Sequence, residues 1–399
     1  MIESPQQLEE ALRNGNLSVS GVAVTPATAM RSAAVFRCVT LSAGIVATVP
    51  MQVKRRIDDK VRADATDVPI WRVLNRRPNR WQKPAAFKRM MQAHVLLRGN
   101  AYAMKVRNAA GEVIELIPLH PDRVQTRQLS DLSVVHVWQR ASGGQLLLRD
   151  DEVMHLYKLT LDGVTGVTPL TFAREAVDEA LALSRHGAAV FKRGANLSGA
   201  LKHPTKLTDE AFARLKEGMA DFRAGGDREG ETIILEEGME YTALGMNMVD
   251  AEWINARNFS RTDIAMFFGT PPHLIGHIDG NTQLGSSIEQ QTQGYLSFGL
   301  EDDLTMWEEG INVDCLDRPG DEKLYMRMNR NALVRGDFAA RTGGYVRALQ
   351  WGWMSPDEVR ELEDMNPRPD GDGGKFYEPP NTAGDAGAPN DPTGGKNNA

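Results

Sequence analysis

The chain has 399 residues, of which 41% are hydrophobic and 25% charged, as in soluble globular proteins of two or three domains. Its formal net charge of −7 argues against binding nucleic acid over a broad basic surface. Cys38 and Cys315, the only cysteines, are too few for a disulfide framework. No signal-peptide core and no apolar run of about 18 residues occur, so we expect neither secretion nor membrane insertion.

The first 160 residues predict helices followed by a sheet. Apolar residues at helical spacing over 28–47 predict a buried helix, and a short strand should follow at 51–56. Another helix is expected from Pro84. Six alternating or apolar segments, separated by turn residues, then predict an antiparallel meander over 101–158. Helices before a sheet indicate an α+β fold.

Two long helices bracketing a small insert are predicted next. The first should span 168–195, because Thr168 is a good N-cap and Pro169 suits the first helical position. The second should span 250–270 and end there, because two prolines follow. The insert, 196–249, contains strand and helix patterns. We therefore expect an antiparallel helix pair that carries a small α/β knob.

A polar, glycine-rich loop is expected over 271–286, and it resembles a tip presented to a partner more than a packed connection. Its polar side chains are His277, Asp279, Asn281, Thr282 and Gln283.

The residues after this loop predict one helix of about 28 residues, about 40 Å long, and then a strand at 323–328 that returns to the first domain. The apolar positions of that helix are Ile288, Tyr295, Phe298, Trp307 and Ile311.

The C-terminal region predicts a pair of helices over 337–364. The second helix opens with a capping box formed by Ser355 and Glu358, with Pro356 at the first helical position. Beyond this pair the chain is rich in Gly, Pro, Asn and Asp, so we expect residues 367–399 to be disordered.

Charge is unevenly distributed along the chain. Residues 71–107 carry ten basic side chains and no acid, whereas 208–240 hold ten acids against four bases. Two interpretations of the basic block stay open: a solvated helix face, or a contact with packed DNA or an acidic partner. Acidic pairs such as Asp302 and Asp303 are interpreted as solvated charges. The candidate contact residues in the basic block are Arg76, Arg77, Arg80 and Lys83.

Sequence patterns of known catalytic sites are missing from the chain. It has no G-x-x-x-x-G-K-[ST] loop, G-x-S-x-G elbow, C-x-x-C pair or H-E-x-x-H pattern. His273 and His277, with Asp279, would suit a metal only on a regular helix, which Pro271 and Pro272 oppose. We therefore predict no enzymatic activity, no metal site and no cofactor.

Six segments, in order, resemble the portal proteins of tailed double-stranded DNA bacteriophages of the siphovirus type. Each segment is a weak signal alone, but the ordered set is specific and covers about 28–370. The segments are LLRGNAY at 96–102, GVTPL at 166–170, FKRGANLSGAL at 191–201, FFGTPPHLIG at 267–276, SSIEQQ at 286–291, and the long segment 335–367.

The resemblance implies a ring, commonly of twelve subunits, at one capsid vertex, through which double-stranded DNA is packaged by the terminase motor and later ejected into the tail. Such a protein is a structural conduit and a docking platform. The implied partners are the terminase large subunit, head-completion or tail adaptor proteins, and the major capsid and scaffolding proteins. The implied location is the virion, after assembly in the host cytoplasm. The alternative is a metal-dependent nuclease or hydrolase associated with phage DNA processing.

The resemblance also gives the predicted segments their family names. They are a wing at 1–167 and 287–336, stem helices at 168–195 and 250–270, a clip at 196–249, a tunnel loop at 271–286, a crown at 337–366 and a tail at 367–399. The tunnel loop would line the DNA channel, and acids of the clip would dock the motor or adaptor. Those acids are Asp209, Glu210, Glu217, Asp221, Asp227 and Glu229.

Overall fold

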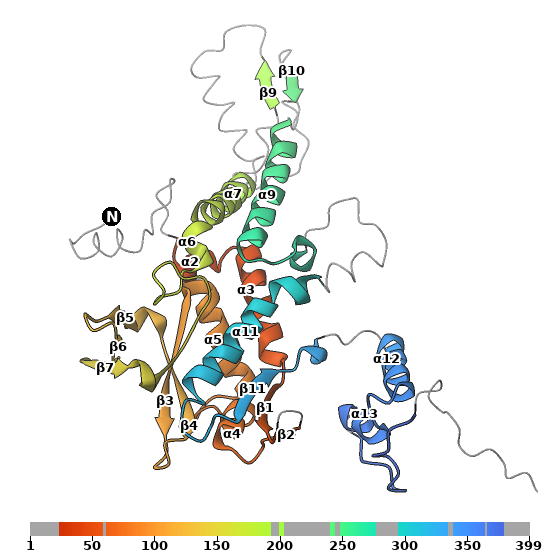
Figure 1. Cartoon of the computed structure of the whole chain (residues 1–399). Coiled ribbons are helices and arrows are strands. Elements are labelled where there is room, and N and C mark those ends of the chain that lie inside the picture. The colour runs from red at the N-terminus through yellow and green to blue at the C-terminus, as the bar shows by residue number, and fades with distance from the viewer. Residues whose placement is uncertain are drawn as a thin grey trace, which may run out of the picture. The chain divides into compact units, whose positions relative to one another are not determined.

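The computed structural model has a mixed α+β architecture (Figure 1). The chain divides into two compact units, Met1–Asn329 and Arg330–Ala399. The structure describes residues 24–58, 61–192, 199–202, 240–243, 248–276, 294–333, 338–363 and 365–378.

Helices at the start of the first unit form the expected buried layer. The helix expected over 28–47 is α3 (Ala33–Thr48), preceded by the single turn α2 (Pro26–Ala29). Helix α5 (Pro84–Arg98) begins at the predicted proline and packs against α3, while α4 (Pro69–Asn75) precedes it. The apolar side of α5 is buried as its spacing predicts, through Phe87, Met91 and Val95.

The six strands expected over 101–158 form, but they make two sheets, so the single meander was wrong. One sheet has the order β4-β3-β8 and the other β5-β6-β7. The last of the six strands, β8, pairs antiparallel with β3, so that Met154 lies opposite Ala103. Because β3 is largely buried, a partner on each side satisfies its backbone groups away from water. The strands are β3 (Asn100–Arg107), β4 (Val113–Leu119), β5 (Val124–Gln128), β6 (Val134–Gln139), β7 (Gln145–Arg149) and β8 (Val153–Tyr157).

A third sheet joins distant parts of the chain, in the order β11-β1-β2. Strand β11 (Leu324–Met328) pairs antiparallel with β1 (Met51–Arg56), which confirms the predicted return to the first domain. The short β2 (Arg62–Asp64) covers the other edge of β1. Helix α11 (Glu301–Asp314) packs against β8 and β11. It thereby joins the β4-β3-β8 sheet to the β11-β1-β2 sheet.

The helix expected after the polar loop is broken within its described part, 294–314. A π-helical turn, Tyr295–Gly299, precedes α11. Trp307 and Ile311 are buried as predicted, but Phe298 is 88% exposed, so its expected burial was wrong. A π-turn bonds residue i to i+5, which rotates the following side chains off the 3.6-residue stripe. Ile288 lies outside the described residues.

Asp303 is buried, which corrects the interpretation of Asp302 and Asp303 as a solvated pair. Lys158 Nζ lies 2.9 Å from Asp303 Oδ1 and 2.8 Å from Asp302 Oδ2. Ser42 Oγ donates a hydrogen bond of 3.0 Å to Asp303 Oδ2. Burial alone would lower the pKa of Lys158, but the two carboxylates outweigh burial and raise it. The partners come from segments more than 100 residues away, which the local pattern cannot reveal.

Within its described residues, the second unit has the α-helices α12 (Phe338–Gln350) and α13 (Pro356–Leu362). The predicted capping box is confirmed, because Ser355 and Glu358 exchange backbone-to-side-chain hydrogen bonds of 2.8 and 3.3 Å. The disorder expected from residue 367 does not apply to 367–378. This segment folds back onto α13, where Asp357 N donates to Gly373 O at 2.8 Å.

Two partly buried histidines in the first unit predict that acid destabilises the fold. Burial lowers the pKa of His94 to about 4 and that of His155 to about 3. Each stays neutral when folded but is protonated when unfolded below pH 6.5, so stability is lost as pH falls. Lowering the pH from 7 to 5 should therefore reduce the free energy of unfolding by about 2 kcal/mol for each histidine. Asp314 has the opposite effect, because burial raises its pKa to about 6. Its protonation between pH 7 and 5 should add about 1 kcal/mol to the free energy of unfolding.

The measurement is urea unfolding at pH 7 and pH 5, where we expect a net loss of about 3 kcal/mol. The double variant His94→Gln/His155→Gln should be less stable at pH 7 yet show a much smaller difference between the two pH values. An unchanged difference would contradict the assignment to these histidines.

Candidate channel and docking surfaces

Two helices side by side form the predicted pair, with the strands β9 and β10 beyond them (Figure 1). The start of the first helix is confirmed: Thr168 Oγ1 accepts a hydrogen bond from Leu170 N at 3.2 Å, and Pro169 is at the first position. This helix is not continuous, however, because α6 (Pro169–Phe172) ends before α7 (Arg174–Lys192) begins. The second helix, α9 (Met248–Phe267), begins two residues before Asp250.

The insert between these helices is described at its two ends. Strand β9 (Gly199–Lys202) pairs antiparallel with β10 (Glu240–Ala243), so the insert begins and ends with strands, as its pattern allowed. Residues 203–239 lie outside the described residues. All six predicted docking acids lie among them.

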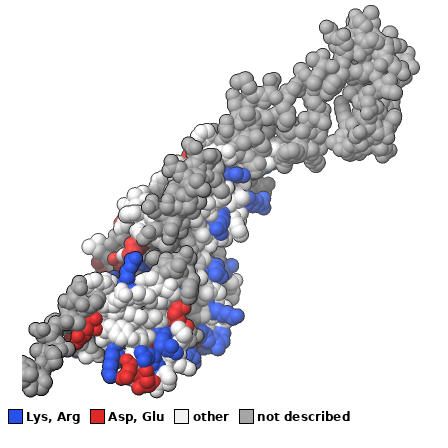
Figure 2. All heavy atoms as spheres, turned by 90° about the vertical axis from the view of Figure 1, so that its right-hand side faces the viewer, with Lys and Arg blue, Asp and Glu red and all other residues white. Residues whose placement is uncertain are grey.

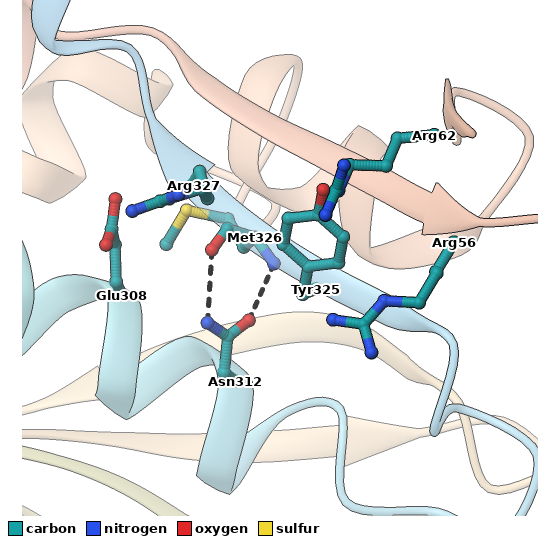
Figure 3. A pocket seen from close by; sticks show the side chains of 7 residues that line it. All are labelled: Arg56, Arg62, Glu308, Asn312, Tyr325, Met326 and Arg327. Atoms are coloured by element: carbon teal, nitrogen blue, oxygen red, sulfur yellow. Dashed lines mark hydrogen bonds between the residues drawn. The ribbon is translucent and has the colours of Figure 1, made fainter. Parts of the chain in front are cut away.

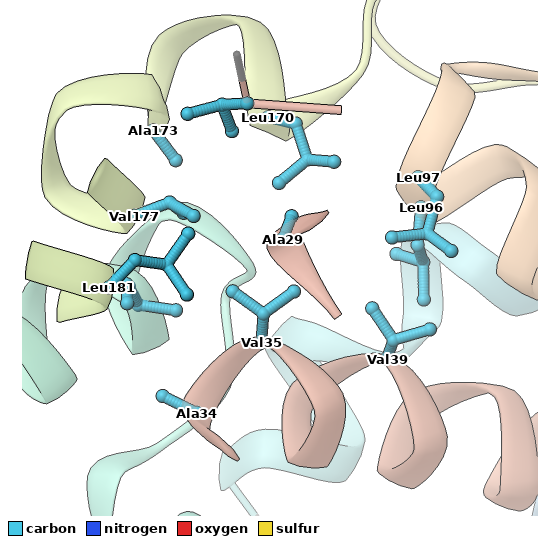
Figure 4. Packing of buried hydrophobic residues seen from close by; sticks show 12 residues of the cluster. Ala29, Ala34, Val35, Val39, Leu96, Leu97, Leu170, Ala173, Val177 and Leu181 are labelled. Atoms are coloured by element: carbon cyan, nitrogen blue, oxygen red, sulfur yellow. The ribbon is translucent and has the colours of Figure 1, made fainter. Parts of the chain in front are cut away.

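The base of the helix pair is anchored in the core of the first unit. One cluster of buried apolar side chains draws on α3, α5, α6, α7 and α9 (Figure 4). Ser260 in α9 adds a hydrogen bond of 3.3 Å to the carbonyl of Ala176 in α7. The helix pair therefore begins as part of the domain below it. Members of the cluster include Val35, Val39, Leu96, Leu170, Val177 and Ile264.

Two of the segments that carry the family resemblance meet at this base. Asn100 Nδ2 donates to Gly166 O, and Gly166 N donates to Asn100 Oδ1, each at 2.8 Å. A Cβ atom on Gly99 would lie 2.4 Å from Gly166 O, so the two backbones approach as closely as glycine allows. Thr168 Oγ1 also donates to Leu96 O at 3.1 Å. The sequence showed both segments but did not show that they touch.

The predicted tunnel loop, 271–286, is described only at its beginning, over 271–276. There, the 3-10 turn Pro272–Ile275 lies against α3, where Arg37 Nε donates to Leu274 O at 3.2 Å. After residues 277–293, a Cβ atom on Gly299 would lie 3.1 Å from Gly269 O, so the described chain before and after those residues comes close together. Residues 277–293 lie outside the described part. The five polar loop residues, His277 to Gln283, therefore stay a prediction.

The arginines at the connection between α4 and α5, in the basic block, contact neighbouring residues of the same chain. Arg80 Nε forms an ion pair of 3.2 Å with Glu115, an acid supplied by β4. Arg77 donates to the carbonyl oxygens of Asn79 and Arg80, and the guanidinium of Arg76 lies 5.6 Å from the centre of the Trp71 ring.

Lys83 is the N-cap residue of α5 and is exposed. Figure 2 shows Lys and Arg side chains interspersed with Asp and Glu side chains over one face of the described surface. Both interpretations of the basic block therefore retain support: Arg76 and Arg80 are largely exposed but already partnered.

No metal site is found where the structure can be searched. Among the described residues, no three or more His, Cys, Asp or Glu side chains are grouped so that they could hold a metal ion. His273 is described, whereas His277 and Asp279 are not. Within the same residues, no helix combines the length and the apolar character needed to cross a membrane.

Comparisons with known proteins agree with this architecture. The family model described as "Phage portal protein" matches residues 33–364. The portal protein of Enterobacteria phage HK97 is 32% identical over 342 residues, covering 85% of this chain and 80% of that protein. The probable portal protein of Streptomyces phage phiC31 is 29% identical over 377 residues, covering 92% and 82%.

A solved structure of the same fold is the neck of a native gene transfer agent particle, computed with C12 symmetry. It superposes with a TM-score of 0.58 at 22% identity, covering 92% of this chain and 95% of that one. The extent of the family match and the identity to the HK97 protein together settle the family: this chain belongs to the phage portal proteins.

Proposed function

We propose that this portal protein forms a ring of twelve copies at one capsid vertex, and that the ring passes double-stranded DNA inward during packaging and outward during ejection. The observation that carries the proposal is the family match over residues 33–364. The twelvefold neck of the gene transfer agent particle supports the copy number. The packing of the helix pair into the core of the first unit supports its proposed role in the channel, because a DNA conduit needs stiff elements joined firmly to the body that forms the ring.

The helix pair and its loop take the roles of stem and tunnel loop in this proposal. The stem is 168–195 with 250–270, the wing 1–167 with 287–336, the clip 196–249 and the crown 337–366. The short distance between Gly269 and Gly299 supports a loop that projects from one place, since the described chain before and after residues 277–293 comes close together there. Twelve such loops would surround the DNA.

The absence of basic residues from the loop supports the view that DNA slides past it and is not bound tightly. Residues 275–285 contain no Lys or Arg, so they gain little from releasing counterions of the phosphate backbone. Asn281, Thr282 and Gln283 can make only uncharged hydrogen bonds to phosphate oxygens. A net charge of −7 per chain adds repulsion from the walls. The DNA would therefore move past the loop without a strong bound state.

The clip is the proposed docking surface for the terminase large subunit during packaging and for a tail adaptor afterwards. Its excess of acids over bases in 208–240 supports recognition that weakens with salt, although each exposed ion pair contributes only about 0 to 1 kcal/mol. The wing would contact capsid and scaffolding proteins. The protein would assemble in the host cytoplasm and end in the virion.

The test introduces charge into the loop. The double variant Asn281→Lys/Gln283→Lys should still form rings with a central hole in negative-stain images, while the yield of DNA-filled particles in an infected host falls by about tenfold or more. Added cations create attractive contacts that the passing phosphates must break. The matched control Asn281→Ser/Gln283→Ser should fill particles normally.

Two results would contradict the proposal. If the lysine variant filled particles with DNA at the normal yield, the loop would not line the channel. A purified protein that forms no ring, or that cleaves DNA with a divalent metal, would favour the nuclease alternative.

A further inference from the structure

A pocket of about 570 Å3 lies where β1, β2 and β11 meet α11 in the first unit (Figure 3). It is separate from the helix pair, the loop and the basic block discussed above. Arg56, Arg62 and Arg327 line it and are exposed. Among the described residues, none of the three guanidinium groups has an ion-pair or hydrogen-bond partner. The pocket therefore holds unneutralised positive charge on a chain that is acidic overall.

Two of these arginines lie directly opposite each other across the strand pair. In the register of β1 and β2, Arg56 lies opposite Arg62. Two residues earlier in β1, on the same face of the sheet, Lys54 lies opposite Asp64. The Lys54 pair forms an ion pair of 2.6 Å, as cross-strand neighbours of opposite charge do. Like charges placed opposite each other destabilise a sheet. A bound anion between Arg56 and Arg62 would remove that repulsion.

The backbone of β11 at the pocket is already fully bonded. Asn312 Nδ2 donates to Met326 O at 3.1 Å, and Met326 N donates to Asn312 Oδ1 at 2.6 Å. Met328 N donates to Glu308 Oε1 at 2.7 Å. These two side chains of α11 replace a neighbouring strand along the edge. A ligand is therefore recognised by the pocket's side chains, and an added strand is excluded from this edge.

The two ends of the pocket differ in charge. In Figure 3, Arg56 and Arg62 lie on one side, around the ring of Tyr325, while Arg327 and the carboxylate of Glu308 lie at the other end. Guanidinium groups bind carboxylates and phosphates with paired hydrogen bonds. A nucleic acid carries a phosphate at every step, so it would bring a negative charge against Glu308. A peptide can place a carboxylate at the arginine end and a neutral residue beside Glu308.

We propose that this pocket binds an acidic segment of a partner protein, with one or two carboxylates between Arg56 and Arg62 and an uncharged residue next to Glu308. The volume suits a few side chains, as in other peptide and small-ligand pockets. A rigid duplex about 20 Å across cannot enter it. The wing thereby gains a specific contact that is independent of the DNA channel and of the proposed docking by the clip.

The test is fluorescence anisotropy of the full-length purified protein with a labelled Asp-Glu-Gly-Ser peptide at low salt. The variant Arg56→Gln/Arg62→Gln should bind at least about tenfold more weakly, because two charge-assisted contacts are lost. The control Arg123→Gln/Arg140→Gln removes the same charge from exposed arginines of the β5-β6-β7 region and should stay within about twofold. The labelled Asn-Gln-Gly-Ser peptide should not bind.

A third variant acts in the opposite direction. Glu308→Gln keeps an acceptor for Met328 N but removes the negative charge from the pocket, so the acidic peptide should bind a few-fold more tightly. Urea unfolding checks that the arginine variants fold, and Arg56→Gln/Arg62→Gln should be at least as stable as the parent because a like-charge pair is gone.

Four outcomes would overturn the proposal. They are absence of peptide binding by the parent protein, equal loss in the pocket variant and its control, a 12-base-pair DNA duplex that competes at the pocket with equal affinity, and loss of ring assembly in the pocket variant. The third outcome would make the pocket a nucleic-acid site, and the fourth a contact between copies. Ring formation and DNA filling of particles are measured separately, so failure here leaves the proposed channel function intact.

Discussion

Replacing Gly99 with alanine is expected to lower the free energy of unfolding by about 4 kcal/mol or more, enough to prevent accumulation of soluble protein. The added Cβ atom would lie 2.4 Å from Gly166 O and 2.7 Å from Thr168 N, distances far below van der Waals contact. Both neighbours are backbone atoms, so no side chain can move aside. The φ angle of +77° adds strain for any residue with a Cβ atom. Soluble yield and urea unfolding measure the effect.

Gly163 provides the matched control for this substitution. It has nearly the same backbone conformation, with φ at +79°, but nothing lies within 4 Å of an added Cβ atom. Gly163→Ala should therefore cost only about 1 to 2 kcal/mol, from backbone strain alone. If both variants lose the same stability, the contact between the segments at Gly99 and Gly166 is not what fixes the helix pair to the domain below.

The buried ion pair of Lys158 with Asp303 gives the second large effect. Asp303→Ala is expected to lower the free energy of unfolding by about 3 to 5 kcal/mol, because it leaves Lys158 half-buried without its inner carboxylate and Ser42 without an acceptor. The neighbouring carboxylate of Asp302 has an exposed fraction of 68%, against 4% for Asp303. Asp302→Ala should therefore change stability by no more than about 1 kcal/mol. Urea unfolding at pH 7 compares the two variants.

A double-mutant cycle separates the ion pair from simple packing. If the charge left on Lys158 causes the loss, Lys158→Met/Asp303→Ala should lose less stability than the single variants Lys158→Met and Asp303→Ala lose in sum, since the double variant keeps no unpaired buried charge. Stability losses that simply add would show that the two side chains act independently. The region matters for the proposed function because Asp303 lies in α11, just after the π-turn Tyr295–Gly299, where the described chain resumes beyond the proposed tunnel loop.

Local sequence signals determined where helices begin and which strands exist. Thr168 with Pro169, Pro84, and the Ser355 capping box each fixed a helix start, because the groups that satisfy the first turn are within four residues of one another. Alternating residues likewise located the six strands between 100 and 157. The ordered family segments, read together, identified the family that the comparisons then established.

Interactions between distant residues were decided only by the tertiary structure. The return of β8 to β3, the burial of Asp303 and the meeting of Arg56, Arg62 and Arg327 all join segments that the sequence separates. A charge pattern read along the chain cannot tell a solvated carboxylate from a paired one, because the partner and the exclusion of water both come from other elements. Strand pairing has the same limit, since each edge offers equivalent backbone groups and packing selects the partner.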